Sequence, residues 1–208
     1  MSIRVIDNYL NQQDFEDLKN LKLNKIDDTS IRVYHNKISN EKVITNSCIH
    51  IDFLKRLHDN YHKKAIQLLG ELNSNKVKLY DYSEFHIIET GANYKFPIHD
   101  DTPDKILSGI VYLNPEKNTG TIFYSDKKVN NKKIVDWKLN RAVFFSRTEK
   151  KTWHSFEGDG TSNRLALVYN LKTTRIKEVY EIEGKNYLYG QFRYKINPFL
   201  LKYFNFTI

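Results

Sequence analysis

One long segment of the chain has apolar side chains at the spacing of an α-helix. Its apolar residues are spaced 3, 4, 4, 3 and 4 positions apart: Leu54, Leu57, Tyr61, Ala65, Leu68 and Leu72. This spacing predicts an amphipathic helix over about residues 51–72, whose apolar face covers the outside of a sheet. A shorter helix is predicted over about residues 12–23, because Asn11 is a good N-cap for an apolar face that begins at Phe15.

Most other apolar residues alternate with polar ones or form short runs, as in β-strands. A short strand is predicted over residues 3–5, and a strand pair over residues 31–34 and 42–44 with a polar turn between them. The β pattern dominates from residue 76 to residue 171.

The last part of the chain is rich in aromatic residues. We expect a hairpin over about residues 179–189 and a short helix over residues 198–204. So many aromatic side chains exclude a free tail, and packing against the rest of the protein is the simplest expectation. A lid over the site and a dimer contact are the alternatives.

Length and composition fit one domain of this kind. At 208 residues the chain is long enough to bury a substantial core, and its 14 Tyr and 12 Phe favour a β-rich one. The predicted fold class is α+β, a mainly β fold with flanking helices. Residues 1–75 would support the sheet, residues 76–171 would form the core, and residues 172–208 would form a C-terminal extension.

Cysteine content and the length of apolar runs indicate the compartment. Cys48 is the only cysteine, which excludes a disulfide framework and a cysteine zinc cluster. The N-terminus is polar, and no apolar run approaches the length of a membrane span. We therefore expect a cytoplasmic protein with no membrane partner.

The positive charge is concentrated in the second half of the chain. Residues 1–100 hold 14 basic and 14 acidic side chains, so the net charge of +8 comes from residues 101–208. The basic residues that stand out are Lys127, Lys128, Lys132, Lys133, Arg147, Lys150 and Lys151. They are most simply part of solvated loops. The alternative is a cationic rim that attracts an anionic substrate or nucleic acid toward the site.

A candidate metal site centres on His99-x-Asp101. Side chains two residues apart on a strand point the same way, so His99 and Asp101 can supply two ligands of a 2-His-1-carboxylate site, the usual holder of non-haem Fe(II). His154 is the only histidine downstream and is the expected third ligand. The adjacent Asp100 competes with Asp101, but strand alternation turns it outward, toward solvent.

His58 and His62 form a rival pair on the predicted long helix. They are four residues apart and could share a helical face. A zinc protease helix has Glu directly after its first His, whereas Asp59 follows here and no further ligand is suitably spaced. We therefore expect two surface histidines rather than a zinc site.

The order of these motifs resembles that of a known enzyme family. His99-x-Asp101, Tyr112-Leu-Asn114, Gly120-Thr-Ile-Phe-Tyr124, His154 and Arg164 follow one another as in the Fe(II)/2-oxoglutarate-dependent dioxygenases, with most similarity to the prolyl 4-hydroxylase-like branch. The match covers about residues 82–171, under half of the chain. The resemblance implies a double-stranded β-helix (jelly roll) and an enzyme that uses Fe(II), 2-oxoglutarate and O2, with ascorbate as an optional cofactor.

The resemblance also implies roles for particular residues. The three ligands would hold iron, 2-oxoglutarate and O2 would fill its other positions, and a substrate C–H bond would be hydroxylated with release of succinate and CO2. Tyr112 and Arg164 would bind the distal carboxylate of 2-oxoglutarate, and Ile122 would face this cosubstrate. Two alternatives stay open: an internal Asp or Glu could pair with Arg164, and Tyr112 could be an ordinary packed core residue.

The sequence does not identify the prime substrate, which could be a small molecule or a peptide. By position alone, Glu89, Tyr94 and Asn170 are the candidate substrate residues. The prolyl hydroxylase branch commonly has a tyrosine ten residues before the first ligand histidine. Glu89 stands at that distance from His99, which argues against peptidyl-proline.

Two other functional classes stay open. One is a non-catalytic metal-binding jelly roll of the cupin kind, which would not need the carboxylate clamp of Tyr112 and Arg164. The other is a basic protein that acts on nucleic acid, such as an oxidative demethylase. It ranks last, because the sequence has no aromatic-basic motif of a nucleic-acid-binding module.

Overall fold

The structure is a computed structural model that describes residues 2–126 and 131–204. The larger sheet contains β1 (Arg4–Ile6), β2 (Ile31–Tyr34), β3 (Lys37–Ser39), β4 (Lys42–Thr45), β5 (Tyr82–Thr90), β7 (Lys105–Asn114), β10 (Ala142–Phe145) and β12 (Arg164–Lys172). The smaller sheet contains β6 (Lys95–His99), β8 (Thr121–Tyr124), β9 (Lys132–Val135) and β11 (Trp153–Glu157).

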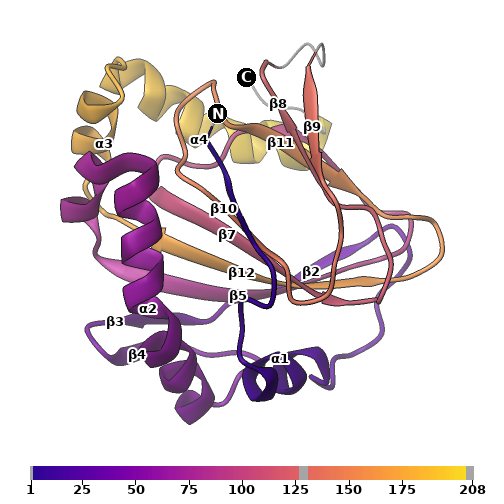
Figure 1. Ribbon diagram of the computed structural model, residues 1–208. Coiled ribbons are helices and arrows are strands. Elements are labelled where there is room, and N and C mark those ends of the chain that lie inside the picture. Colours follow the sequence, from indigo (N-terminus) through magenta and orange to yellow (C-terminus); the bar gives the residue numbers. More distant parts are fainter. Residues whose placement is uncertain (1, 127–130, 205–208) are drawn as a thin grey trace.

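Both sheets are antiparallel. The larger has the strand order β1-β10-β7-β12-β5-β3-β4, with β2 also paired to β5, and the smaller has the order β6-β11-β8-β9. The strands of the smaller sheet lie over one end of the larger sheet (Figure 1), so the two enclose a space between their inner faces. This mainly β architecture with flanking helices is the predicted jelly roll.

Helices flank the sheets. They are α1 (Gln12–Lys19), α2 (Ile51–Asn73), the 3-10 helix η1 (Ser74–Leu79), α3 (Ile176–Ile182) and α4 (Tyr187–Phe204). Helices α1 and α2 cover the outside of the larger sheet. Helix α2 confirms the predicted long helix: Leu54, Leu57 and Ala65 are fully buried in one core cluster with Phe85 and Ile87 of β5. Among the described residues, no helix combines the length and the apolar character needed to cross a bilayer.

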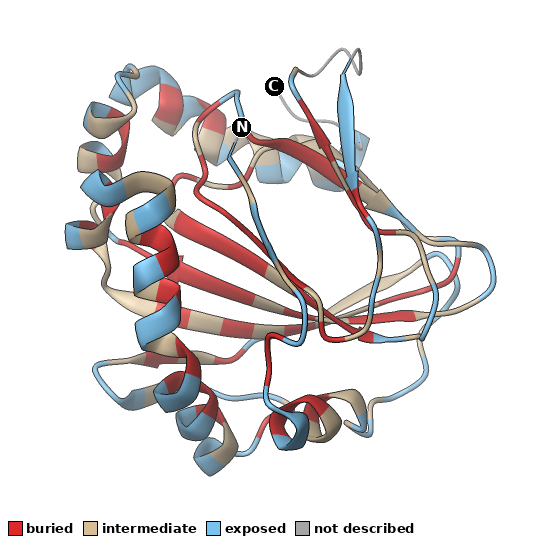
Figure 2. Ribbon diagram, in the orientation of Figure 1, coloured by how far each residue is buried: buried red, intermediate tan, exposed pale blue. Residues whose placement is uncertain are grey.

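Strand alternation separates this core from the site. On β12, Tyr169 faces the helices and stacks on Phe85 with ring centroids 4.2 Å apart. The alternate residues of the same strand face the other way, into the space between the sheets: Arg164, Ala166, Val168 and Asn170. Figure 2 shows the central strands of the larger sheet buried along most of their length. Each large apolar side chain buried there contributes about 1.5–3 kcal/mol.

The N-terminal strands pair differently from the prediction. Strand β2 pairs with β5 rather than with β4, and β3 occupies the segment predicted to be a turn. The actual turn is at Asn40 and Glu41, which both have positive φ angles (46° and 62°). Such a two-residue turn matches the twist of a hairpin, which explains why β3 and β4 pair across it.

The predicted hairpin over residues 179–189 is wrong, because this segment contains the end of α3 and the start of α4. Gly184 has a positive φ angle of 64° and follows the end of α3, where a left-handed residue is common. The Asn186 side chain accepts a hydrogen bond from the Tyr189 backbone N–H at the start of α4. These two residues resemble the signals of a β-turn, but here they end one helix and cap the next.

Candidate metal centre

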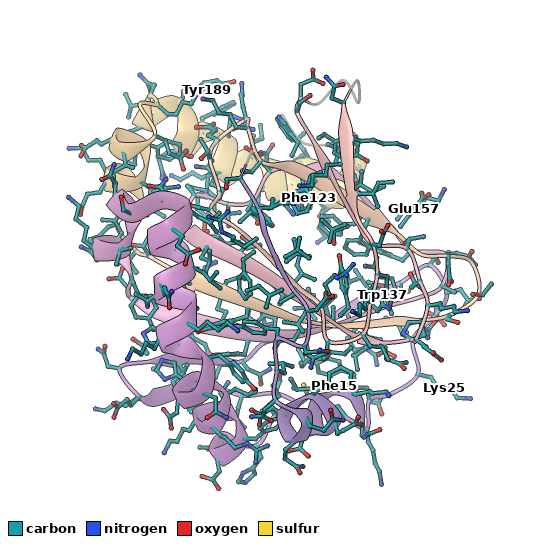
Figure 3. The ribbon with its side chains drawn as sticks, viewed as in Figure 1. Phe15, Lys25, Phe123, Trp137, Glu157 and Tyr189 are labelled. Carbon is teal, nitrogen blue, oxygen red and sulfur yellow. The ribbon has the colours of Figure 1, made fainter. Side chains whose placement is uncertain are left out.

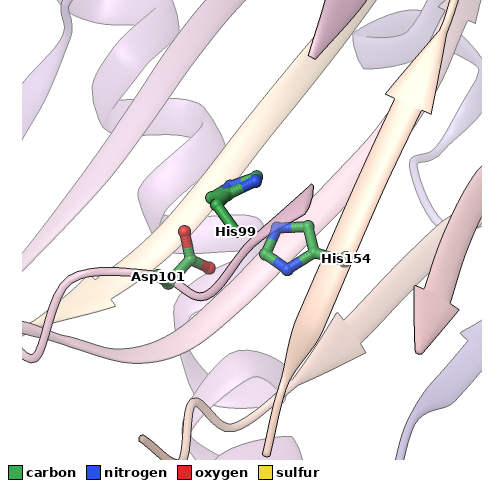
Figure 4. A group of neighbouring side chains, drawn as sticks. All are labelled: His99, Asp101 and His154. Carbon is green, nitrogen blue, oxygen red and sulfur yellow. The ribbon is translucent and has the colours of Figure 1, made fainter. Parts of the chain in front are cut away.

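Three side chains converge at one point between the sheets. His99 ends β6, Asp101 stands two residues later, and His154 lies on β11 (Figure 4). The antiparallel pairing of β6 and β11 places His154 opposite His99, with ring centroids 4.2 Å apart. One ligand atom from each of the three residues lies within 4.8 Å of the others. In the described part of the chain, this is the only group of three or more such residues that could hold a metal ion.

Backbone carbonyls set the orientation of both histidines. His99 Nδ1 lies 3.0 Å from the Pro97 carbonyl oxygen, and His154 Nδ1 lies 2.9 Å from the Thr152 carbonyl oxygen. A carbonyl only accepts, so each Nδ1 carries the proton and each Nε2 presents a lone pair. This outer hydrogen bond is typical of histidines that ligate metals. Burial and the neighbouring His154 lower the pKa of His99 to about 3, which keeps its ring neutral at physiological pH.

Asp101 is held as a carboxylate. Its Oδ1 accepts a hydrogen bond from Lys105 Nζ (2.6 Å), and its Oδ2 accepts one from Ser108 Oγ (2.5 Å). Burial acts to raise its pKa, but the charge of Lys105 and its hydrogen bond to the carboxylate outweigh burial, so the pKa is lowered. Two imidazole nitrogens and one carboxylate therefore converge in ionisation states suited to a divalent metal such as Fe(II). Sequence reasoning missed Lys105 and Ser108, although both lie within seven residues of Asp101.

Asp100 does not face solvent, which corrects the expectation from strand alternation. Its carboxylate accepts a hydrogen bond from the Lys150 backbone N–H (2.9 Å) and lies 3.4 Å from Arg193 of α4. The side chains of Asp100 and Arg193 are each only 3% exposed. Arg193 also pairs with Glu149, so α4 is joined by ion pairs to both segments that carry metal ligands.

A cavity of about 130 Å³ runs from the metal ligands to Arg164 along the inner faces of both sheets. The Arg164 guanidinium lies 4.3 Å from the Phe156 ring and 4.8 Å from the Trp137 ring. Figure 3 shows Trp137 in the interior, between the two sheets. Burial lowers the pKa of Arg164 to about 10, so the side chain stays charged at neutral pH.

This guanidinium lacks an acidic partner among the described residues. Arg164 is 5% exposed, and its Nε and Nη1 atoms make no hydrogen bond. No ion pair links it to an Asp or Glu of residues 2–126 or 131–204. Buried cations are ordinarily paired, because taking an unpaired charge out of water is costly. The internal Asp or Glu partner that the sequence left open is therefore absent among the described residues. The unpaired N–H groups of Arg164 border the cavity instead.

Tyr112 lies behind the cavity wall rather than on it. Its hydroxyl donates to Thr121 Oγ1 (2.8 Å) and accepts from the Thr121 backbone N–H (3.1 Å). Thr121 itself lines the cavity. The Tyr112 ring stacks on Trp137 at 4.3 Å, so both Tyr112 and Arg164 pack on the same indole. Thr121 belongs to the Gly120–Tyr124 motif. A correct assignment of which face of this strand points inward would have identified it as a cavity residue.

Ile122 does not face the cavity, which corrects the sequence prediction. Its neighbours on β8 point inward: Thr121 lines the cavity, and the Phe123 ring lies 5.9 Å from the His154 ring. Alternation therefore turns Ile122 to the outer face of the smaller sheet.

The three candidate substrate residues have different positions. Asn170 lines the cavity, on the same face of β12 as Arg164. Glu89 does not line it, because β5 turns Ile88 and Thr90 inward and Glu89 to the opposite face, beside Arg32 of β2. Tyr94 also lies off the cavity wall, with its ring 6.1 Å from that of Phe156.

A second cavity of about 260 Å³ adjoins the metal ligands on the side of the C-terminal helices. It shares His99 and Asp101 with the first cavity. Helix α4 contributes Arg193, Tyr194, Asn197 and Pro198 to its wall. The C-terminal segment therefore packs beside the candidate metal centre, as one wall of a space next to it.

The basic residues do not form one rim. Arg147 is 2% exposed and pairs with Glu183 at 2.6 Å, so it is a buried structural cation. Lys150 and Lys151 are exposed, and Lys150 Nζ lies 3.2 Å from the hydroxyl of Tyr189. Lys132 and Lys133 are exposed on β9, whereas Lys127 and Lys128 lie outside the described residues.

The two helical histidines are not the surface residues predicted. His58 is 8% exposed and stacks on His62 with ring centroids 4.6 Å apart. His62 in turn packs against Tyr80 at 4.7 Å. The pair fills space between α2 and the chain that leads into β5, and it does not meet a third ligand within the described residues.

Comparisons with known proteins bear on the fold. No protein-family model and no curated protein matches the sequence. Among solved structures, a Pseudomonas putida prolyl-4-hydroxylase is similar, with a TM-score of 0.53 and 15% identity over 82% of this chain and 92% of that one. A 2OG-Fe(II) oxygenase family oxidoreductase from Burkholderia pseudomallei has a TM-score of 0.59 and 11% identity, over 82% and 84% of the two chains.

A third similar structure is a Trichoplax adhaerens prolyl hydroxylase in complex with a peptide fragment of the hypoxia inducible factor oxygen degradation domain. Its TM-score is 0.54 and its identity is 14%, over 84% of this chain and 85% of that one. At such low identity the similarity is one of fold. The chain therefore has the double-stranded β-helix fold of these 2-oxoglutarate-Fe(II) oxygenases.

Proposed function

We propose that this protein is an Fe(II)- and 2-oxoglutarate-dependent dioxygenase that hydroxylates a substrate C–H bond and releases succinate and CO2. The observation that carries the proposal is Arg164, a buried cation that lines the same cavity as the candidate metal ligands and has no acidic partner among the described residues. A dicarboxylic acid placed in this cavity would reach a metal at one end and the guanidinium at the other. Arginine pairs with carboxylates through two parallel hydrogen bonds, which suits this role.

The residues of the site would have distinct roles in this reaction. His99, Asp101 and His154 would hold the metal on one side and leave its other positions open. Bound Fe(II), 2-oxoglutarate and O2 would supply the oxidising chemistry, with ascorbate as an optional cofactor. Arg164 would orient the distal carboxylate of the cosubstrate, with Thr121 beside it and Tyr112 fixing Thr121 from behind.

The walls between the two ends would exclude water. They are mostly apolar and include Ile88, Ile110, Phe145, Ala166 and Val168. A dry, low-dielectric cavity strengthens the pairing of Arg164 with a bound carboxylate. A peptide is a plausible substrate, because one of the structurally similar enzymes holds a peptide fragment. The cytoplasm remains the expected compartment.

A cupin-like module without turnover is the runner-up. Such a module needs the metal ligands, but it does not need a buried arginine kept free for a carboxylate. Arg164 therefore distinguishes the two proposals, and its substitution is the direct test.

Arg164→Leu should weaken 2-oxoglutarate binding while metal binding is retained. A lost hydrogen bond to a charged group costs about 1.5–3 kcal/mol, which corresponds to about a 10- to 150-fold rise in Kd. The measurement is a 2-oxoglutarate titration of Fe(II)-loaded protein without O2, followed by succinate formation in air. Arg32→Leu, at a partly buried arginine of β2 that does not line the cavity, is the matched control and should leave both unchanged. An unaltered titration in Arg164→Leu would contradict the cosubstrate assignment.

A further inference from the structure

A second buried polar side chain of the same cavity has one atom that is unpaired among the described residues. Asn170 is 1% exposed and lines the cavity from β12. Its Oδ1 atom has no hydrogen-bond donor within the described residues. Almost all buried polar atoms in native proteins are paired, so this acceptor calls for a donor supplied from the cavity.

The orientation of the Asn170 amide is fixed by Glu84. Asn170 Nδ2 donates to Glu84 Oε2 at 3.4 Å, and the same oxygen lies 3.2 Å from His86 Nε2 and 3.5 Å from Lys172 Nζ. Burial acts to raise the pKa of Glu84, but the hydrogen bond from His86 and the charge of Lys172 outweigh it and lower the pKa to about 2. An ionised carboxylate only accepts hydrogen bonds, so the NH2 end of Asn170 must face Glu84. The oxygen of the amide is therefore turned away from Glu84.

Asn170 and Arg164 border different parts of the cavity. The two residues are six positions apart on one face of β12, which is about 20 Å between their backbones along an extended strand. Asn170 pairs in register with Ser108, whose hydroxyl donates to Asp101. It therefore lies beside the residues that support the candidate ligand Asp101.

The charges around Asn170 favour an uncharged partner. Glu84 lies directly behind the amide, and the carboxylate of Asp101 is held by the neighbouring Ser108. These two carboxylates disfavour an anionic group at this position. The nearby cations are already engaged, Lys172 by Asp104 (2.5 Å) and Lys105 by Asp101 (2.6 Å). A neutral N–H or O–H is the group that satisfies the acceptor without adding a charge.

We infer that Asn170 is a substrate-binding residue, whose Oδ1 accepts a hydrogen bond from an uncharged N–H or O–H group of the prime substrate close to the metal. The inference rests on the proposed function, and it specifies the part of the substrate that enters the cavity. The substrate class is one with an amide or hydroxyl group beside the oxidised C–H bond. Charged groups elsewhere on the substrate would stay outside this end of the cavity.

The test uses small probes of matched shape. Acetamide carries N–H donors, N,N-dimethylacetamide has none, and acetate carries a charge. Each is titrated into ¹⁵N-labelled protein that holds Zn(II), which replaces iron without turnover, and saturating 2-oxoglutarate. The readout is the NMR signal of the Asn170 side-chain amide, assigned by its loss in Asn170→Leu.

Acetamide should bind in the millimolar range and shift the Asn170 signal. N,N-dimethylacetamide should bind about 3- to 10-fold more weakly, the ratio expected for one neutral hydrogen bond. Asn170→Leu should lose this preference and keep its 2-oxoglutarate affinity within about twofold, since Asn170 and Arg164 border different parts of the cavity. The matched control Asn24→Leu, at an exposed asparagine, should behave as wild type.

Four results would overturn the inference: no acetamide binding by the wild type, equal binding of the two amides, stronger binding of acetate than of acetamide, or a loss of 2-oxoglutarate affinity in Asn170→Leu as large as that in Arg164→Leu. The comparison of the two amides on the wild type needs no variant, so misfolding of Asn170→Leu cannot obscure it. Failure of the wild type to bind 2-oxoglutarate would instead refute the proposed function. The acetamide titration can then be repeated without the cosubstrate.

Discussion

Glu183 should contribute far more to stability than its place near the C-terminus suggests. Its carboxylate lies 2.6 Å from Lys76 Nζ and 2.6 Å from Arg147 Nη1, and it accepts the Glu149 backbone N–H at 2.9 Å. The side chains of Glu183, Lys76 and Arg147 are at most 2% exposed. Glu183→Gln removes the negative charge from this group while preserving the shape of the side chain.

The expected loss follows from the two cations left behind. Removing one partner of a buried ion pair typically costs about 3–5 kcal/mol, because an uncompensated charge stays in the interior. For a protein of this size, 1 kcal/mol corresponds to about 2–4 °C in Tm, so Tm should fall by about 6–20 °C. Urea denaturation followed by far-UV circular dichroism measures the free energy of unfolding. The segment that carries Asp101 should also become more mobile, because Arg147 donates to the backbone carbonyl of Asp101 at 3.1 Å.

Two variants test the reasoning. Glu181→Gln, two residues earlier at a 61% exposed side chain that only approaches Lys177 at 3.9 Å, should change stability by less than about 0.5 kcal/mol. Adding Lys76→Met to Glu183→Gln should recover part of the loss, because it removes one of the two unpaired charges. A loss below about 1 kcal/mol in Glu183→Gln, or an equal loss in Glu181→Gln, would refute the argument.

Three further predictions concern the site. Removing any one candidate ligand, as in His99→Ala, Asp101→Ala or His154→Ala, should abolish Fe(II)-dependent succinate formation. Circular dichroism should show that the fold is retained. Wild-type turnover in any of the three variants would exclude the triad. Thr121→Val should raise the 2-oxoglutarate Kd more than Tyr112→Phe does, because Thr121 lines the cavity and Tyr112 acts through it; the reverse order in a titration would contradict this. Glu84 has a folded-state pKa of about 2 against 4.5 when free, so its contribution to stability is complete above pH 4.5 and is lost as the pH falls toward 2. Glu84→Gln should therefore flatten the pH dependence of the free energy of unfolding between pH 4.5 and 2. An unchanged pH dependence would count against the lowered pKa.

The sequence predicted the parts of the site that depend on local geometry. His99 and Asp101 could be paired from the two-residue repeat of a strand, and the inward face of β12 followed from the same rule. The long helix α2 was predicted almost to its ends, because six apolar positions at helical spacing leave little freedom.

The sequence could not predict features that depend on which strand face or which helix meets the site. Ile122, expected to face the cosubstrate, and Glu89, a candidate by position alone, both lie on strand faces turned away from the cavity, since a shift of one residue reverses every side chain of a strand. Asp100 was expected in solvent because nothing in the local pattern shows that α4 would place Arg193 against it, 93 residues later. The alternation of β12 predicted that Arg164 faces inward, but only the fold shows that no described carboxylate reaches it.

The position of α4 after all the described strands has a consequence for the order in which the site is built. All three metal ligands and Arg164 precede residue 165, yet one wall of the second cavity comes from residues 193–198. A chain emerging N-terminus first can therefore assemble the β framework before this wall exists. Until Arg193 arrives, Asp100 and Glu149 lack the guanidinium that joins them, and the segments bearing the ligands are not yet tied together. The candidate metal centre would thus reach its final form only when α4 docks.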